Sequence, residues 1–176
     1  SGRYNSLPKG SGPYAIILVS SWNAVRKIFI EALSLLQGER NIRIIDLFGA
    51  GEDLKMCPLI NGCELLIATP PSLKRVLELR YVQLNRLCHL VIDDADETLT
   101  EFTMEIREIT VNYFRELSRQ EDRSAPQQIL LFGTQWEHIV QNYVQSYMVD
   151  PTIVITSRYE ASLYGKVKQV PIVCRK

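Results

Sequence analysis

Short apolar runs alternate along this chain with segments of helical periodicity, and that alternation most constrains the fold. The runs rich in aliphatic and β-branched residues cover positions 14–19, 43–47, 64–68, 87–92, 128–132 and 152–156, with a last extended run at 170–174. Apolar residues at helical spacing mark the intervening segments, including 22–36, 102–117 and 139–147. A parallel sheet covered by helices on both faces buries such continuous apolar strands. The sequence therefore predicts an α/β fold, a three-layer sandwich with a mostly parallel sheet.

Polar residues and breakers predict where the helices begin and end. Ser20 and Ser21 offer N-cap oxygens to the first helix, and Gly38 suits its C-terminal cap. Ser72 can cap a helix that begins at Leu73. A short helix is expected over 52–59, and Asp-Pro at 150–151 stops the last helix.

Composition excludes several function classes. Basic and acidic side chains number 20 each, so no global positive field draws the chain to nucleic acid, and any such binding must be local. No apolar run approaches the roughly 18 residues that span a bilayer. The N-terminus lacks an apolar signal core, and the four cysteines lack metal-binding spacing. We expect a single domain in a reducing, cytoplasmic compartment, with no membrane contact.

An acidic loop follows the apolar run 87–92, and it is the strongest chemical signal. In open α/β sheets, ligands bind outside the carboxyl ends of the strands. Asp93 at the strand end can hold Mg²⁺, usually through water, while Asp94 can orient or deprotonate an attacking water. The alternative is a solvated acidic turn that caps the following helix.

The strand-end loops, taken in order, resemble the motifs of the first RecA-like domain of the DEAD-box RNA helicases, a family of P-loop NTPases. Residues 19–23 stand where the family has Val-Pro-Thr-Arg-Glu, 48–51 at its paired-glycine loop, 61–73 at the strand leading to Thr-Pro-Gly-Arg, 91–97 at Val-Leu-Asp-Glu-Ala-Asp and 131–135 at Leu-Phe-Ser-Ala-Thr. The resemblance implies a helicase-like RecA domain over 13–160. Residues 161–176 would then lead to a second RecA-like domain, and 1–12 would be a tail or cloning remnant.

The resemblance also implies roles for individual residues. Asp93 and Asp94 would contact ATP and Mg²⁺, with Asp93 on the metal through water, and Asp96 would complete the catalytic acidic motif. Single-stranded RNA would lie along Ser21, Trp22, Gly49, Thr69 and Ser72. Thr134 or Gln135 would bridge to Asp96 and couple the nucleotide state to RNA strand separation.

Departures from the family pattern weaken parts of this assignment. Trp22 and Ser72 stand where the family has arginine, and Pro71 removes an amide donor, so RNA should bind weakly and with a shallow salt dependence. Trp22 either stacks on a base or packs on the neighbouring helix. Asp94 replaces glutamate and is one methylene shorter, which should slow hydrolysis.

A phosphate-binding loop of the Gly-x-x-x-x-Gly-Lys-Ser/Thr kind is absent from the sequence, because Lys9-Gly10-Ser11-Gly12 is followed by Pro13 and a strand rather than a helix. We expect that the first strand and this loop are missing, through a cut or because a parent protein supplies them elsewhere. Ser1-Gly2, which resembles a cloning remnant, favours a cut. Alone, the chain should therefore hold no cofactor.

The missing strand would lie between 128–132 and 152–156 in a RecA-like domain. The two runs could pair directly and close the gap, or residues 3–7 could fill it. Alternatively, the open strand edges could pair with another molecule. Filling by the chain's own or a neighbour's strand is the preferred expectation.

The motif style further resembles the Tudor-domain-containing helicase-like proteins of the animal piRNA pathway. That likeness implies piRNA biogenesis and transposon silencing in the germline, partners among the PIWI-pathway proteins, and a place in the cytoplasm or in germline granules. Two functions stay open: part of an ATP-dependent RNA helicase core, or a non-catalytic helicase-like scaffold that binds RNA or protein partners. A structural module without nucleotide is a third possibility.

Overall fold

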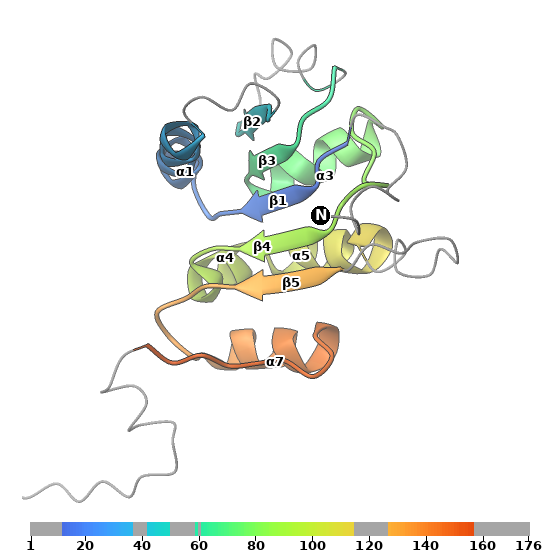
Figure 1. The fold of residues 1–176 in the computed structure, drawn as a ribbon. Helices are drawn as coiled ribbons and strands as arrows, with labels where there is room; N and C mark the ends of the chain where they lie inside the picture. The colour runs from blue at the N-terminus through green and yellow to red at the C-terminus, as the bar shows by residue number, and fades with distance from the viewer. Residues whose placement is uncertain (1–11, 37–41, 50–58, 60, 115–126, 157–176) are drawn as a thin grey trace, which may run out of the picture.

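The computed structural model describes residues 12–36, 42–49, 59, 61–114 and 127–156 (Figure 1). Its sheet is entirely parallel, in the order β2-β3-β1-β4-β5. The strands are β1 (Ala15–Leu18), β2 (Ile44–Leu47), β3 (Leu65–Ala68), β4 (His89–Ile92) and β5 (Gln128–Leu131). The first five apolar runs thus form strands, as the sequence predicts.

The strand order reverses at the centre of the sheet. After β1 the chain moves outward to β2 and returns to β3, and it then crosses β1 to reach β4 and β5 on the other side. The connections that follow β1 and β4 therefore leave in opposite directions. Such a switch point opens a crevice at the carboxyl ends of the strands, where α/β proteins bind their ligands.

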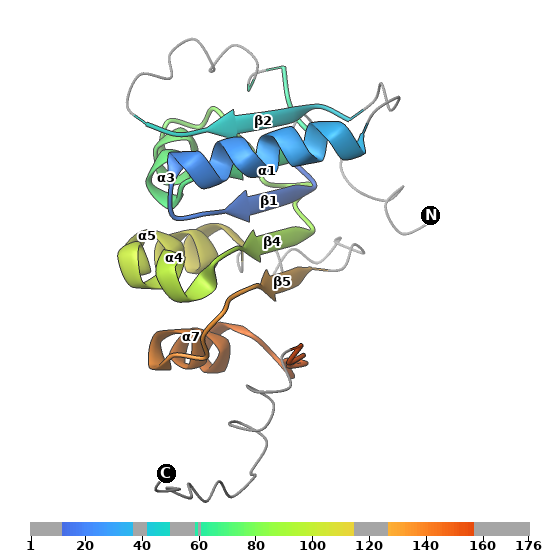
Figure 2. The same ribbon diagram turned by 90° about the vertical axis from the view of Figure 1, so that its left-hand side faces the viewer.

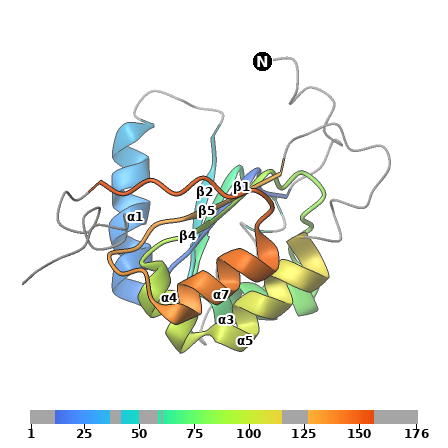
Figure 3. The same cartoon turned by 90° about the horizontal axis from the view of Figure 1, so that it is seen from below.

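Helices cover the two faces unequally (Figure 3). On one face, α1 (Trp22–Leu35) is the one helix within the described ranges. The helices on the other face are α3 (Pro70–Glu78), α4 (Ala95–Glu101), α5 (Thr103–Glu108), the π-helix η2 (Ile109–Phe114) and α7 (His138–Tyr147). The predicted three-layer sandwich is confirmed.

The alternation of side chains along β1 explains the two layers. Ile16 and Leu18 have no exposed surface and belong to the larger core beneath α3, α4 and α7. Ile17 and Val19 point the opposite way and pack with Val25 of α1 in a smaller core. A period of two along a strand produces this division.

The helix starts agree with the sequence at α1 and differ at α3. Ser21 caps α1, because its Oγ accepts a hydrogen bond from the Ala24 amide at 3.3 Å. Helix α3 begins at Pro70, so the predicted start at Leu73 is wrong. Proline is tolerated in a first turn, where its missing N–H has no intrahelical partner. Helix α1 ends at Leu35 with Leu36 as its C-cap, and the expected cap Gly38 lies outside the described residues.

The predicted single helix over 102–117 is divided. Phe102 ends α4 and precedes α5. After α5 the α-helical hydrogen-bond pattern changes to the wider π-helical pattern of η2. Two threonine hydroxyls donate back to carbonyls one turn earlier, Thr103 to Leu99 at 2.6 Å and Thr110 to Ile106 at 2.7 Å. Such back-bonding bends helices.

The sixth predicted strand is wrong. Residues 152–156 have no regular structure and are exposed, with Ile153 at 56% and Val154 at 78%. Within the described residues β5 pairs with β4 alone, so direct closure onto 152–156 does not occur. A strand without a ladder partner leaves its backbone groups to water. Residues 3–7, 170–174 and all but Leu59 of the 52–59 helix fall outside the described residues, and pairing with another molecule stays a prediction.

No helix within the described ranges is long and apolar enough to cross a membrane.

Candidate functional site

The predicted site residues follow the ends of five parallel strands, and Figure 2 shows those ends at one edge of the sheet. Ser21 and Trp22 follow β1, Gly49 follows β2, Thr69 and Ser72 follow β3, Asp93, Asp94 and Asp96 follow β4, and Thr134 and Gln135 follow β5. The fold therefore gathers residues up to 114 positions apart in the sequence along one edge.

The acidic loop is held from both sides by main-chain hydrogen bonds. The Asp93 amide donates to the Leu18 carbonyl of β1 at 2.9 Å, and the Ala95 amide donates to the Phe132 carbonyl after β5 at 2.8 Å. The Thr98 hydroxyl donates to the Asp93 carbonyl at 2.7 Å. These contacts fix the loop at the switch point of the sheet.

The Asp93 carboxyl is half-buried, and its pKa is raised above the ordinary value mainly by burial. The charges of Asp94 and Glu31 add to this effect, while a backbone hydrogen bond from Asp94 and the charge of Lys27 oppose it. Burial favours the protonated form of this carboxyl group. A bound divalent cation would favour the ionised form instead, so the position is suited to a metal ion.

Asp94 stands at the N-cap position of α4 with a left-handed backbone (φ 43°, ψ 53°). Aspartate is one of the few residues that tolerate this region. Its side chain makes no capping hydrogen bond and is exposed. The Asp94 carboxylate therefore does not cap α4, and its role at a nucleotide site stays a prediction.

Asp96 contacts the loop after β5 through Thr134. The Thr134 amide and hydroxyl donate to the two oxygens of the Asp96 carboxylate, at 3.3 and 3.0 Å. Gly133 lets the loop approach, because a Cβ there would lie 2.8 Å from Asp96 Oδ1. Of the two bridging candidates in the sequence, Thr134 makes the contact, and the coupling role stays a prediction.

One further contact at this edge could not be predicted from the sequence. The Ser20 hydroxyl, which is buried, donates to Glu97 Oε1 at 3.1 Å and joins the loop after β1 to α4. Ser20 stood out only as a possible helix cap.

The expected RNA-contacting residues differ in how accessible they are. Gly49 is exposed with φ +82°, and no residue in the described ranges lies within 4 Å of where its Cβ would be. Thr69 donates its hydroxyl to Ser72 at 2.9 Å, and Ser72 is buried in the first turn of α3. Trp22 is 57% exposed, and its ring lies near that of Phe48, after β2.

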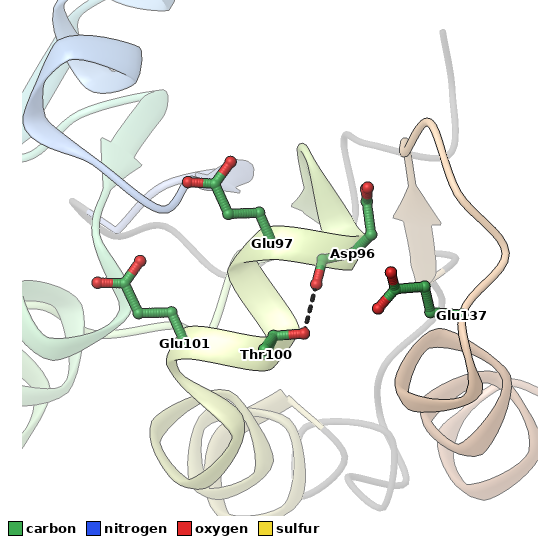
Figure 4. Close-up of a pocket in the computed structure, with 5 residues that line it drawn as sticks. All are labelled: Asp96, Glu97, Thr100, Glu101 and Glu137. Carbon is green, nitrogen blue, oxygen red and sulfur yellow. Dashed lines mark hydrogen bonds between the residues drawn. The ribbon is translucent and has the colours of Figure 1, made fainter.

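An open hollow of about 350 Å³ lies beside this edge, between α4 and the start of α7 (Figure 4). It is lined by Asp96, Glu97, Thr100, Glu101 and Glu137. Four carboxylates repel phosphate, so this hollow is unsuited to a nucleotide.

The residues present could bind the metal ion of a nucleotide site, but they lack the loop that binds its phosphates. In the described part of the chain, no three His, Cys, Asp or Glu residues are grouped to hold a metal ion. Mg²⁺ needs only one or two carboxylates when waters and substrate phosphates complete its shell, and Asp93 meets that need. The sequence contains no phosphate-binding loop to hold the phosphates.

Comparison with known proteins decides the family. A family model described as DEAD/DEAH box helicase matches residues 3–141. The chain belongs to this family. Human TDRD12, whose name proposes an ATP-dependent RNA helicase, is 32% identical over 97% of the chain, and the ATP-dependent RNA helicase DBP2 of Encephalitozoon cuniculi is 27% identical over 96%.

The chain spans a small part of these relatives, 15% of TDRD12 and 32% of DBP2. Among solved structures, the yeast DEAD-box splicing factor Prp28 matches with a TM-score of 0.67 and 22% identity, over 79% of this chain and 31% of that one. That likeness confirms the RecA-like α/β fold.

Proposed function

We propose that this chain forms part of the core of an ATP-dependent RNA helicase. The observation that carries the proposal is the acidic loop at the switch point, where Asp93 is fixed to β1 and Asp96 is bound by Thr134. Membership of the DEAD/DEAH box helicase family supports it.

Each acidic residue has a separate task in this proposal. When bound, Mg-ATP supplies the bond that is broken, and the metal neutralises phosphate charge. Asp93 would hold the metal through water, and Asp94 would orient or deprotonate the attacking water. The Asp96–Thr134 contact would carry the state of this site to the neighbouring strand-end loop.

Single-stranded RNA is the proposed second ligand, along the edge from Ser21 to Gly49 and Thr69. Because Trp22 and Ser72 replace arginines, few phosphates would be neutralised, and affinity should be low and weakly salt-dependent. A second RecA-like domain would close over the nucleotide in a longer protein that contains this chain.

The biological setting belongs to the same proposal. Likeness in motif style to the Tudor-domain-containing helicase-like proteins, together with 32% identity to human TDRD12, supports a role in piRNA biogenesis and transposon silencing. PIWI-pathway partners and a place in the cytoplasm or germline granules would follow.

RNA-stimulated ATP hydrolysis by a longer protein with an intact phosphate loop tests the proposal. Asp93→Ala should abolish hydrolysis. Thr134→Val should reduce RNA stimulation more than basal hydrolysis, while Gln135→Ala, the matched control, should change neither. Absence of hydrolysis in the parent would favour the non-catalytic scaffold. Full activity of Asp93→Ala would contradict the role proposed for Asp93.

A further inference from the structure

We propose that Trp22 and Phe48 form a stacking platform for a base of single-stranded RNA. The inference rests on the proposed function for the presence of RNA and adds a contact to the base itself. The ring centroids lie 6.2 Å apart with the planes tilted by 34°. Although one side of the indole adjoins Phe48, 57% of Trp22 is exposed.

Core packing and a helix cap hold the two rings of the platform in place. Phe48 is half-buried and packs against the smaller core, which contains the fully buried Val25 of α1. Trp22 is the first residue of α1, whose start is fixed by the Ser21 cap. A tryptophan held in this way loses little freedom when a ligand stacks on it, since only two side-chain torsions are involved.

The surroundings of the pair favour nucleic acid over a protein partner. Gly49 follows Phe48 directly, is exposed, and among the described residues has no neighbour within 4 Å of its Cβ position, which leaves room there for a sugar-phosphate backbone. Arg26, which is exposed, stands about one turn along α1 from Trp22 and supplies positive charge for a phosphate. Proteins that bind single strands combine positively charged side chains with aromatic rings on which bases stack. Here both kinds of side chain lie at the edge of the sheet where α/β proteins bind ligands.

A platform of this kind changes what the edge recognises. Stacking depends on the π-face of a base and not on phosphate charge, so it tolerates any sequence and resists salt. It would replace, at position 22, the contribution that an arginine makes through phosphate.

Two ligands of equal length separate base contacts from backbone contacts: single-stranded oligoadenylate, and an abasic sugar-phosphate oligomer. Affinities of the 176-residue chain are measured by anisotropy. Trp22→Ala should weaken oligoadenylate binding about 5- to 150-fold and leave abasic binding unchanged. Trp22→Phe should retain most of the affinity. Ile30→Ala removes an equally exposed apolar side chain (58%) from the same helix and should have no effect.

A second readout keeps the platform intact. In a Trp136→Phe background, Trp22 is the remaining tryptophan, and its emission should be quenched by oligoadenylate but not by the abasic oligomer. This measurement holds even if Trp22→Ala fails to fold.

The outcomes separate the platform from the proposed function. Equal binding of the two oligomers, or unchanged oligoadenylate affinity in Trp22→Ala, would overturn the platform while RNA binding stands, and would leave the pair as a protein-docking surface. A wild-type chain that binds neither oligomer would overturn both.

Discussion

At the scale of single residues, the Asp93 carboxylate proposed to hold the metal lowers the stability of the fold when it is ionised. Its pKa is raised in the fold, chiefly by burial, so the folded chain binds that proton more tightly than the unfolded chain does. The contribution of Asp93 to the free energy of unfolding is therefore greatest below the ordinary pKa of 3.8, and it is lost as pH rises from there through the folded pKa. At neutral pH the ionised carboxylate destabilises the fold.

Asp93→Asn should consequently raise the melting temperature at neutral pH, because the amide imitates the uncharged acid. The difference from wild type should shrink as pH falls and vanish below about 3.8. Melting curves across this pH range check it. Glu101→Gln makes the same change from carboxylate to amide at an exposed position on α4, and as the control it should not raise the melting temperature. A lower melting temperature for Asp93→Asn at neutral pH would contradict the prediction.

At the scale of secondary-structure elements, Arg86 joins segments at the amino ends of the strands. Its side chain is 8% exposed, and its Nε donates to the Gly12 carbonyl at 2.8 Å. The guanidinium donates to the Tyr14 hydroxyl at 3.1 Å and lies 4.4 Å from the centre of that ring. The Glu64 carboxylate, just before β3, forms an ion pair with the guanidinium, with 3.8 Å between Oε1 and Nη2. One arginine thus ties the chain before β1 to the loops before β3 and β4.

Arg86→Met should lower the free energy of unfolding by about 2–4 kcal/mol, because it removes charge-assisted hydrogen bonds and leaves their buried acceptors unpaired. Urea unfolding of the 176-residue chain measures the change. Arg75→Met, at an exposed position on α3, is the control and should cost no more than about 0.5 kcal/mol. Equal effects of the two changes would mean that Arg86 does not join these segments.

At the scale of the whole molecule, the sheet ends at β5 in the part that the structure describes. In this edge strand Ile129, Leu130 and Leu131 are apolar, and residues 153–155 beyond α7 are exposed and apolar as well. Unpaired backbone groups next to apolar surface promote association with a second strand.

We expect the 176-residue chain to self-associate as its concentration rises. Leu130→Lys should shift it toward monomer in sedimentation experiments, because a charge on an edge strand disfavours pairing. Met104→Lys places the same charge at an exposed site on α5 and should leave association unchanged. A wild-type chain that is monomeric at every concentration would contradict this expectation.

Nucleotide affinity also depends on the whole molecule, because one nucleotide site is built from several loops. A complete site needs main-chain amides around the phosphates, and the sequence contains no loop that supplies them. We therefore expect titration calorimetry to detect neither binding nor hydrolysis of ATP by the 176-residue chain at low micromolar nucleotide. Measurable binding would show that residues 9–12 hold phosphate without a following helix.

The first five strands and the Ser21 cap could be predicted because they depend on neighbouring residues. Short apolar runs and a serine before a helical pattern are local signals. The order of the strand-end loops placed Asp93, Asp96 and Thr134 at one edge, since parallel strands end on the same side. Locally, residues 152–156 have the same strand character, yet they form none, because a strand also requires a partner.

Contacts between distant positions were decided by the tertiary structure alone. Ser20 and Glu97 are 77 positions apart, and Arg86 and Gly12 are 74 apart. The contact between the tilted rings of Trp22 and Phe48 likewise joins the first turn of α1 to the loop after β2. The amino-acid pattern determined which segments became strands and helices and at which edge their loops met. Which side chains met there, and which were left exposed, depended on packing between elements, because periodicity carries no information about the partner.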